Sequence, residues 1–233
     1  MASSLSRALD ERLASDGASP LITFYDDATG ERTELSATTL ANWVSKTCGL
    51  IDSHGVMAGD DVGLWLPVHW QSAAILLACW RVGAVAVLAE EPVGLAFAQE
   101  RRLDQAVNAA DEVIGLALAP MAGRLHDLPF GAEDYAVEIP GHPDQWTASH
   151  PPPDSVALRD DQTWTADDLL ARAVAIPHAG QRILTTASEW TLPSITDVLL
   201  GPLATGGSVV LVRNPDPAQA ERRALTERAT HQL

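Results

Sequence analysis

Apolar and polar positions along the middle of the chain form blocks that predict strands and helices in turn. Short apolar runs at 62–66, 84–88 and 113–118 are typical of buried strands, and the stretches 70–82 and 95–110 are typical of helices. Strands that are apolar throughout and alternate with helices indicate a parallel sheet covered on both faces. The pattern therefore predicts an α/β fold.

A hairpin followed by a capped helix is expected twice. Near the N-terminus, apolar segments at 21–25 and 31–35 flank an Asp-Asp turn, and Ser36 then begins a long amphipathic helix. Residues 155–174 repeat the order of strand, Asp-Asp turn, strand and capped helix. Two interpretations stay open: a weak internal repeat, or two unrelated units of the same local design.

The last third of the chain returns to alternating strands and helices. Strands are expected at 182–186 and 208–212, with a helix at 195–203 between them. Asp216 is placed to cap a final helix with Pro217 at its first position, where a missing amide hydrogen costs nothing.

The segment between these parts is less regular. A strand is expected at 135–139, and five prolines within 140–154 indicate a linker. Four side chains that can ligate metals gather there, namely His142, Asp144, His150 and Asp154. Their spacing fits neither a helix nor a hairpin, so a solvated loop is favoured and no metal site is expected.

The charge of the chain limits its partners. With 31 acidic against 15 basic residues, the formal charge is −16, which disfavours nucleic acid and anionic membranes. The basic residues are 14 arginines and one lysine, Lys46. Any reaction that requires a lysine elsewhere in the chain is therefore excluded.

Three further features favour a cytoplasmic location. No run approaches the ~20 apolar residues of a membrane-spanning helix, and the first residues lack an apolar signal core. Cys48 and Cys79 lie in predicted helices without a CxxC pair. Buried, reduced thiols are therefore expected in place of a disulfide or a metal site.

The best candidate for a ligand site is the loop after the strand at 182–186. Common phosphate, nucleophile and zinc motifs are absent from the sequence. This loop lies at the carboxyl end of a predicted parallel strand, where α/β sheets bind ligands, and Glu189 beside Trp190 could orient a small molecule. A purely structural loop is the alternative. The candidate crevice comprises Thr186, Ser188, Glu189 and Trp190, with Trp164 and Thr165 from the second hairpin.

One stretch of sequence resembles a known family. Residues 59–87 read GDDVGLWLPVHWQSAAILLACWRVGAVAV. This run is similar to the N-terminal part of the adenylate-forming superfamily, which includes acyl-CoA synthetases, luciferases and peptide-synthetase adenylation domains and shows a GDxVxxxLP strand and an ACxRxGA helix end. The segment 202–211, PLATGGSVVL, resembles a later part of the same region.

The resemblance implies a shortened N-terminal domain of such enzymes, with mainly parallel sheets flanked by helices in two adjoining lobes. Lobe one is expected at about 58–155. Lobe two is expected to combine residues 1–57 with residues 156–233, because the relatives build it from discontinuous segments. The N-terminal hairpin and helix should therefore share a sheet with the C-terminal strands.

The departures from the superfamily are equally specific. Its phosphate loop, rich in Ser, Thr and Gly and ending in Pro-Lys-Gly, should fall near 156–170, where this chain has no glycine and no lysine. A histidine usually follows the next strand, but this chain has Ser188, Glu189 and Trp190 there. The superfamily's later motifs and its C-terminal domain fall beyond residue 233.

These departures imply a catalytically inactive relative that acts as a binding or regulatory protein. No cofactor is expected, and ATP or AMP binding is disfavoured because opposing negative charges need lysine, Mg²⁺ or backbone amides to neutralise them. Two alternatives remain open. One is half of a split AMP-forming acyl ligase completed by another chain, and the other is a small-molecule enzyme that uses the crevice near Glu189.

The resemblance also bears on association. In longer relatives the sheet that contains the strand at 208–212 continues, so this chain is expected to have an open strand edge or apolar face there. The final helix, a second copy in a homodimer, or another protein partner would cover residues 208–233. Arg222, Arg223 and Arg228 could meet an acidic partner surface, and a solvated helix face is the alternative.

Overall fold

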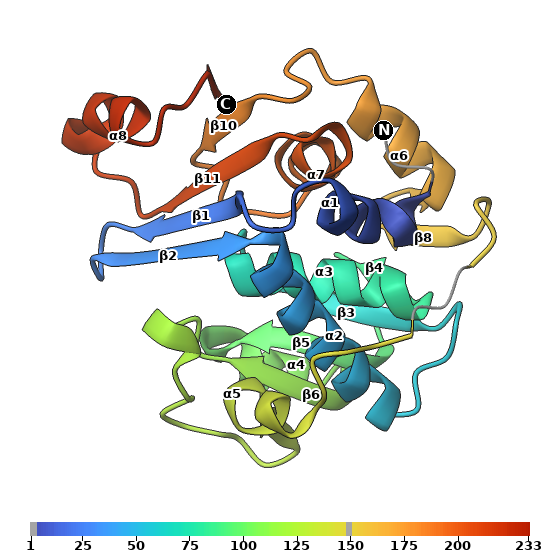
Figure 1. Ribbon diagram of the computed structural model, residues 1–233. Helices are drawn as coiled ribbons and strands as arrows, with labels where there is room; N and C mark the ends of the chain where they lie inside the picture. The colour runs from blue at the N-terminus through green and yellow to red at the C-terminus, as the bar shows by residue number, and fades with distance from the viewer. Residues whose placement is uncertain (1–3, 148–150) are drawn as a thin grey trace.

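Two β-sheets stack with helices between them and against their outer faces (Figure 1). This computed structural model describes residues 4–147 and 151–233. The expected α/β fold with mainly parallel sheets is confirmed. No helix of the described residues is long and apolar enough to cross a membrane.

The five-stranded sheet joins the two ends of the chain. β1 pairs in parallel with β11, with Ile22 opposite Val209, and antiparallel with β2. The N-terminal hairpin therefore shares a sheet with the C-terminal strands, as the resemblance implied. In spatial order the strands are β12 (His231–Gln232), β10 (Arg182–Thr185), β11 (Ser208–Arg213), β1 (Pro20–Asp26) and β2 (Glu31–Ser36).

The seven-stranded sheet holds the middle of the chain and also the second hairpin. This hairpin joins through β8, which pairs in parallel with β4. Residues 58–155 were expected to form one sheet by themselves. This boundary is wrong, because β8 and β9 lie beyond residue 155 and belong to the same sheet. The division of the chain into two lobes stays a prediction. In spatial order the strands are β7 (Ala132–Asp134), β6 (Ala110–Leu116), β5 (Val93–Gln99), β3 (Asp61–Trp65), β4 (Val85–Val87), β8 (Val156–Arg159) and β9 (Thr163–Thr165).

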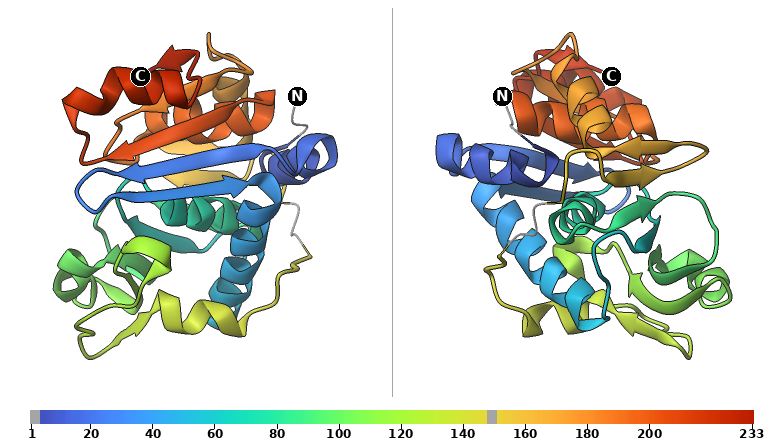
Figure 2. Two further views of the ribbon diagram at one scale, coloured as in Figure 1. Left: turned by 60° about the vertical axis from the view of Figure 1, so that its left-hand side comes forward. Right: turned by 90° about the vertical axis from the view of Figure 1, so that its right-hand side faces the viewer.

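The helix α3 (Trp70–Val82) lies between the two sheets (Figure 2). All its residues except Arg81 are buried, as expected of a helix that is apolar around its whole circumference. The imidazole of His69 caps its first turn, and Gly83 ends it with a φ of 89°, a left-handed conformation that favours glycine.

The other helices surround this centre, and α2 packs directly beside α3. Ser36 caps α2 as predicted, because its side chain accepts a hydrogen bond from the amide of Thr39. The remaining helical elements are α1 (Ala8–Asp16), α2 (Ala37–Ser53), α4 (Leu103–Ala106), α5 (Tyr135–Glu138), α6 (Ala166–Val174), a π-helical segment (Ser194–Leu200), α7 (Gly201–Thr205) and α8 (Ala220–Thr226). Short 3-10 turns occur at Leu5–Arg7, Glu100–Arg102, Pro120–Ala122, Ile139–Gly141 and Pro217–Gln219.

The outer face of the five-stranded sheet is covered by α8. Alternate residues of β11 point to opposite faces, so Val209 and Leu211 join the main core while Val210 and Val212 pack with Ala224 of α8. The outer face of the seven-stranded sheet packs against α4 in the same manner, through Leu103 and Ala106. The apolar central strands, such as β11 and β5, are therefore buried on both faces, as their apolar sequences predicted.

Two predicted elements are wrong. The helix expected at 95–110 is the strand β5 followed by the short helix α4, because Leu95 and its neighbours are buried between β3 and β6. The strand expected at 135–139 is the helix α5, which Asp134 caps by accepting a hydrogen bond from the amide of Ala136. Tertiary contacts override local pattern in the first case, and a cap was missed in the second.

Of the two expectations for 208–212, the open strand edge is wrong, whereas an apolar sheet face is present and the final helix covers it. β11 lies inside the sheet between β10 and β1, and β12 pairs along the far side of β10. Arg223 does not face outward, because its guanidinium bonds the buried carboxylate of Asp27 in the same chain. The chain thus covers this region itself, and association with a partner stays a prediction.

Candidate functional site

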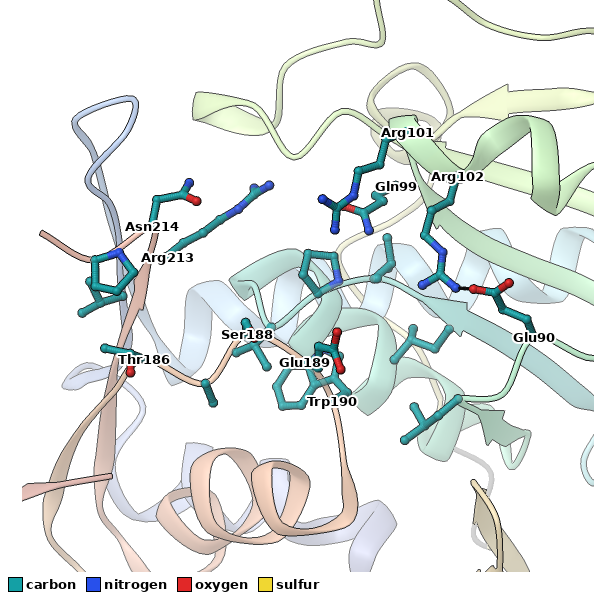
Figure 3. Close-up of a pocket in the computed structure, with 18 residues that line it drawn as sticks. Glu90, Gln99, Arg101, Arg102, Thr186, Ser188, Glu189, Trp190, Arg213 and Asn214 are labelled. Carbon is teal, nitrogen blue, oxygen red and sulfur yellow. Dashed lines mark ion pairs between the residues drawn. The ribbon is translucent and has the colours of Figure 1, made fainter.

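A cavity of about 900 Å³ opens where the carboxyl ends of parallel strands from both sheets converge (Figure 3). The residues that follow β3, β4 and β5 line one wall, and the residues that follow β10 and β11 line the other. In open α/β folds ligands bind outside the carboxyl ends of the strands. The topology therefore marks this cavity as the candidate site.

The predicted crevice after β10 forms part of the wall. Thr186, Ser188, Glu189 and Trp190 all line the cavity. The loop that carries them is anchored to the other sheet, because the carbonyl of Ser188 accepts a hydrogen bond of 3.0 Å from the amide of Val68. The loop is therefore held in place at the junction of the two sheets.

Trp190 stabilises the wall of the cavity and presents little of its side chain to a ligand. Its side chain is buried, and the indole Nε1 donates a hydrogen bond of 2.9 Å to the hydroxyl of Ser72. Glu189 forms an isolated antiparallel bridge with Pro67 through its backbone. Of this pair, Trp190 is buried and Glu189 is exposed, so Glu189 can meet a ligand.

The other two predicted crevice residues, Trp164 and Thr165, do not line this cavity. The Trp164 indole donates a hydrogen bond of 3.2 Å to Asp160, and the Arg172 guanidinium lies 4.5 Å from the centre of its ring. Thr165 caps α6 in a reciprocal pair of hydrogen bonds with Asp168. Both residues stabilise the second hairpin and the start of its helix, at the edge of the seven-stranded sheet.

The sequence analysis missed three arginines that line the cavity. Arg101 and Arg102 belong to the 3-10 turn after β5, and Arg213 is the last residue of β11. Treating 95–110 as a helix hid the first two, because it removed the strand end that places them. Their scarcity could have drawn attention to them, since basic residues are few in a chain of charge −16.

The three arginines are neutralised to different degrees. Arg102 forms an ion pair with Glu90, and burial lowers the pKa of Arg102 while the charge of Glu189 partly offsets this effect. The Nε of Arg213 lies 4.0 Å from Asp26. Arg101 makes no ion pair within residues 4–147 and 151–233. Two guanidinium groups thus remain available to the cavity.

His69 lies close to this site but serves the fold. Its Nδ1 accepts a hydrogen bond of 3.1 Å from the amide of Gln71, which leaves the ring proton on Nε2. Burial, together with the charge of Arg213, lowers the pKa of His69 to about 3. The imidazole is therefore neutral at ordinary pH and caps α3 without carrying a proton to a ligand.

Comparison with known proteins places the chain in a family. A "TIGR03089 family protein" of Mycobacterium tuberculosis is 42% identical over 97% of this chain and 96% of its own length. The chain belongs to the TIGR03089 family. None of the family models searched matches it.

More distant relatives place this TIGR03089 family member beside adenylate-forming enzymes. Acetyl-coenzyme A synthetase of Coprinopsis cinerea is 29% identical over 54% of the chain, which spans 20% of that enzyme. A Brucella canis acyl-CoA synthetase structure matches 97% of the chain with a TM-score of 0.78 and 16% identity. The anthranilate CoA ligase AuaEII, solved with anthranoyl-AMP, matches 95% with a TM-score of 0.73 and 13% identity.

These matches confirm the resemblance to the N-terminal part of adenylate-forming enzymes at the level of the fold. The chain covers 45% of the Brucella canis structure and 47% of the ligase structure. It thus spans just under half of the solved enzymes that it resembles, although it spans nearly all of its Mycobacterium tuberculosis relative.

In this TIGR03089 family member, an acidic turn lies within 156–170, the segment where the resemblance implied a phosphate loop. Asp160 accepts hydrogen bonds from the amide of Gln162, at 2.8 Å, and from the indole of Trp164. Arg159, just before the turn, pairs with Asp61 at 2.5 Å and with Glu91 at 2.9 Å. The carboxylate of Asp160 is therefore bonded within the turn, and Arg159 is already paired with two acids.

The single lysine is committed elsewhere. Lys46 donates a hydrogen bond of 2.8 Å to the carbonyl of His142 and pairs with Asp144 at 3.1 Å. Of the four linker residues that could ligate a metal, His150 lies outside the described residues. No group of three or more metal-ligating side chains occurs among those that the structure describes.

Proposed function

We propose that the protein is a non-catalytic relative of adenylate-forming enzymes that binds a small molecule in the cavity between its two sheets. The observation that carries this proposal is the acidic, self-bonded turn at Asp160, in the segment where the resemblance implies the phosphate loop. The cavity itself supports a retained binding role, because strand ends from both sheets still converge on it.

Charge argues against adenylation in this chain. Adenylation brings a carboxylate to a triphosphate, and the enzyme must supply positive charge where negative charge accumulates. Here the turn contributes Asp160 and Asp161, and the only lysine is paired with Asp144. We therefore expect neither ATP nor AMP to serve as a cofactor of this protein.

The direct test is exchange of labelled pyrophosphate into ATP by the purified chain, with a panel of carboxylic acids and Mg²⁺. We expect no exchange above a protein-free blank, and no difference between the wild-type chain and the variant Lys46→Ala. Robust exchange that is lost in Lys46→Ala would overturn the proposal.

The same assay separates the two alternative functions. The chain spans just under half of the solved acyl-CoA synthetase. A split ligase, in which a second chain supplies the other half, is therefore the first alternative. Exchange that arises only after a second purified chain is added would favour that alternative. An enzyme that uses Glu189 would show no exchange but would convert a substrate in a manner abolished by Glu189→Gln.

We also propose a cytoplasmic location and retain self-association as a prediction. Cys48 and Cys79 are both buried free thiols, and burial raises the pKa of Cys48 to about 12. Unreactive thiols of this kind suit a reducing compartment. Light scattering at micromolar concentration tests association: a homodimer would have twice the mass of 24.8 kDa, and a clean monomer would contradict it.

A further inference from the structure

We propose that Arg101 and Arg213 form a clamp for the phosphoryl group of a small ligand, an inference that rests on the proposed binding function. Arg101 enters the cavity from the turn after β5 of one sheet, and Arg213 enters it from the end of β11 of the other. In Figure 3 their guanidinium groups extend toward one another across the cavity, with Gln99 beside Arg101.

The backbone fixes the point from which Arg213 extends. The next residue, Asn214, has a φ of 47° in the left-handed region, which asparagine tolerates better than most residues. Its side-chain amide donates a hydrogen bond of 2.8 Å to Asp26, whose own side chain is 5% exposed. The turn that follows β11 is therefore held firmly, and the clamp has one well-defined arm.

The groups around the clamp have unused hydrogen-bonding capacity. Gln99 lines the cavity, and its side-chain amide makes no hydrogen bond within the part of the chain that the structure describes. Arg101 has no ion pair among the same residues, and Arg213 approaches an acid only through Nε. These three side chains together could donate to one ligand.

The local charge balance favours an anion. Three arginines and two glutamates line the cavity, and Arg102 is already paired with Glu90. Arg101 and Arg213 are like charges directed into one space, so their mutual repulsion disfavours the empty cavity. An anion between them would turn that repulsion into two attractions.

The arrangement favours a phosphoryl group over a carboxylate. A planar carboxylate is best bound by one bidentate guanidinium, which uses both of its oxygens. A phosphoryl group has three terminal oxygens in different directions and nearly two negative charges at pH 7, so it can accept from two opposed arginines. The anion site of this chain would thus lie at β5 and β11, away from the acidic turn at Asp160.

The test is titration calorimetry at low ionic strength with three probes: inorganic phosphate, phenyl phosphate and benzoate. We expect phenyl phosphate to bind about tenfold or more tightly than benzoate, and the binding to weaken as salt is added. Arg101→Gln and Arg213→Gln should each weaken phenyl phosphate by about tenfold or more. Arg222→Gln, which removes an exposed arginine from α8, is the matched control and should leave the affinity unchanged.

Arg101→Gln keeps the test decisive even if Arg213→Gln disturbs folding, because Arg101 is exposed and unpaired in the described structure. Its thermal unfolding midpoint should equal that of the wild-type chain. Three results would each overturn the clamp: no phosphate probe binds, benzoate binds as tightly as phenyl phosphate, or Arg101→Gln binds like the wild-type chain.

Failure of the clamp and failure of the proposed function are distinguishable. Absent phosphate binding together with absent pyrophosphate exchange rejects the clamp and leaves the proposed function standing. Pyrophosphate exchange by the purified chain rejects the proposed function, whatever the phosphate titration shows.

Discussion

In each hairpin–helix unit of the chain, the first strand joins a sheet in parallel and the second strand forms the edge of that sheet. β1 pairs with β11 and leaves β2 at one edge, and β8 pairs with β4 and leaves β9 at another. Each unit ends in a helix whose first turn is capped by the last residue of the hairpin, Ser36 or Thr165.

The two Asp-Asp turns differ in what they bind. In the first unit, Asp27 bonds the guanidinium of Arg223 and the amide of Asp216, about 190 residues further along the chain. In the second unit, the hydrogen bonds that Asp160 makes within residues 4–147 and 151–233 all stay in its own hairpin. Similar local sequence thus produces the same kind of hairpin in both units. Distant partners decide whether the turn also bonds the C-terminal helix, as in the first unit, or bonds within its own hairpin, as in the second.

The largest expected effect comes from removing the carboxylate of Asp27. Asp27→Ala would leave the Arg223 guanidinium, whose side chain is 7% exposed, buried without its partner, at a cost of about 3–5 kcal/mol of unfolding free energy. Asp160→Ala removes hydrogen bonds at an exposed turn and should cost about 1 kcal/mol. Urea unfolding of both variants measures the difference, with exposed Asp161→Ala as the control.

A similar loss in the two variants would contradict the comparison, because it would mean that both turns serve the fold locally. A loss in Asp27→Ala that disappears in the double variant with Arg223→Leu would sharpen the comparison, since it would trace the cost to the unpaired arginine.

A smaller loss of folding stability is expected at low pH. Burial alone would raise the pKa of Asp27, but hydrogen bonds from Arg223 and the Asp216 amide outweigh it, so the pKa lies below its usual 3.8. Burial alone would likewise raise the pKa of Glu227. Hydrogen bonds from Tyr25, Arg182 and Arg32 outweigh the effect of burial, so this pKa lies below its usual 4.5.

Because both folded-state pKa values lie below the unfolded values, the unfolded chain binds more protons in this range. The stabilisation is therefore complete above about pH 5 and is lost as the pH falls through the lowered pKa values. Unfolding midpoints measured from pH 6 down to pH 3 should fall, and the fall should be shallower in Asp27→Asn. An equally steep fall in that variant would remove Asp27 from the explanation.

The smallest effects should be equal in the two units. Ser36→Ala and Thr165→Ala each remove an N-cap hydroxyl that accepts a backbone hydrogen bond, at a cost of about 1 kcal/mol each. Urea unfolding measures both, with Ser36→Asp and Thr165→Asp as variants that should restore the cap. A much larger cost at one site would show that the two caps are not the same local device.

The central part of the fold was predictable because its signals are local. The apolar run of β3, the apolar circumference of α3 and the left-handed Gly83 all agree with one another. β5 was not predictable in this way, because its identity as a strand depends on burial between β3 and β6. Sequence pattern thus identified long elements with consistent local signals, and it failed for β5, where neighbouring strands decide the outcome, and for the short helix α5, whose cap was missed.

Only the part of the candidate site that follows β10 was predictable from the sequence. The loop after β10 could be located because ligands favour the carboxyl ends of parallel strands, and Glu189 does line the cavity. Arg101 and Arg213 could not be brought together from sequence, because they lie on different sheets and more than 100 residues apart. Their meeting depends on how the two sheets pack, which no local pattern records.

The parallel pairing of β1 with β11 also sets a waiting time during synthesis on the ribosome. Ile22 and Val209 are neighbours in the sheet but are made about 190 residues apart. At roughly 5–20 residues per second, the first hairpin therefore waits on the order of ten to forty seconds for its partner strand. Throughout that interval the apolar side chains of Ile22 and Phe24, both buried in the finished protein, lack the strand that will lie beside them.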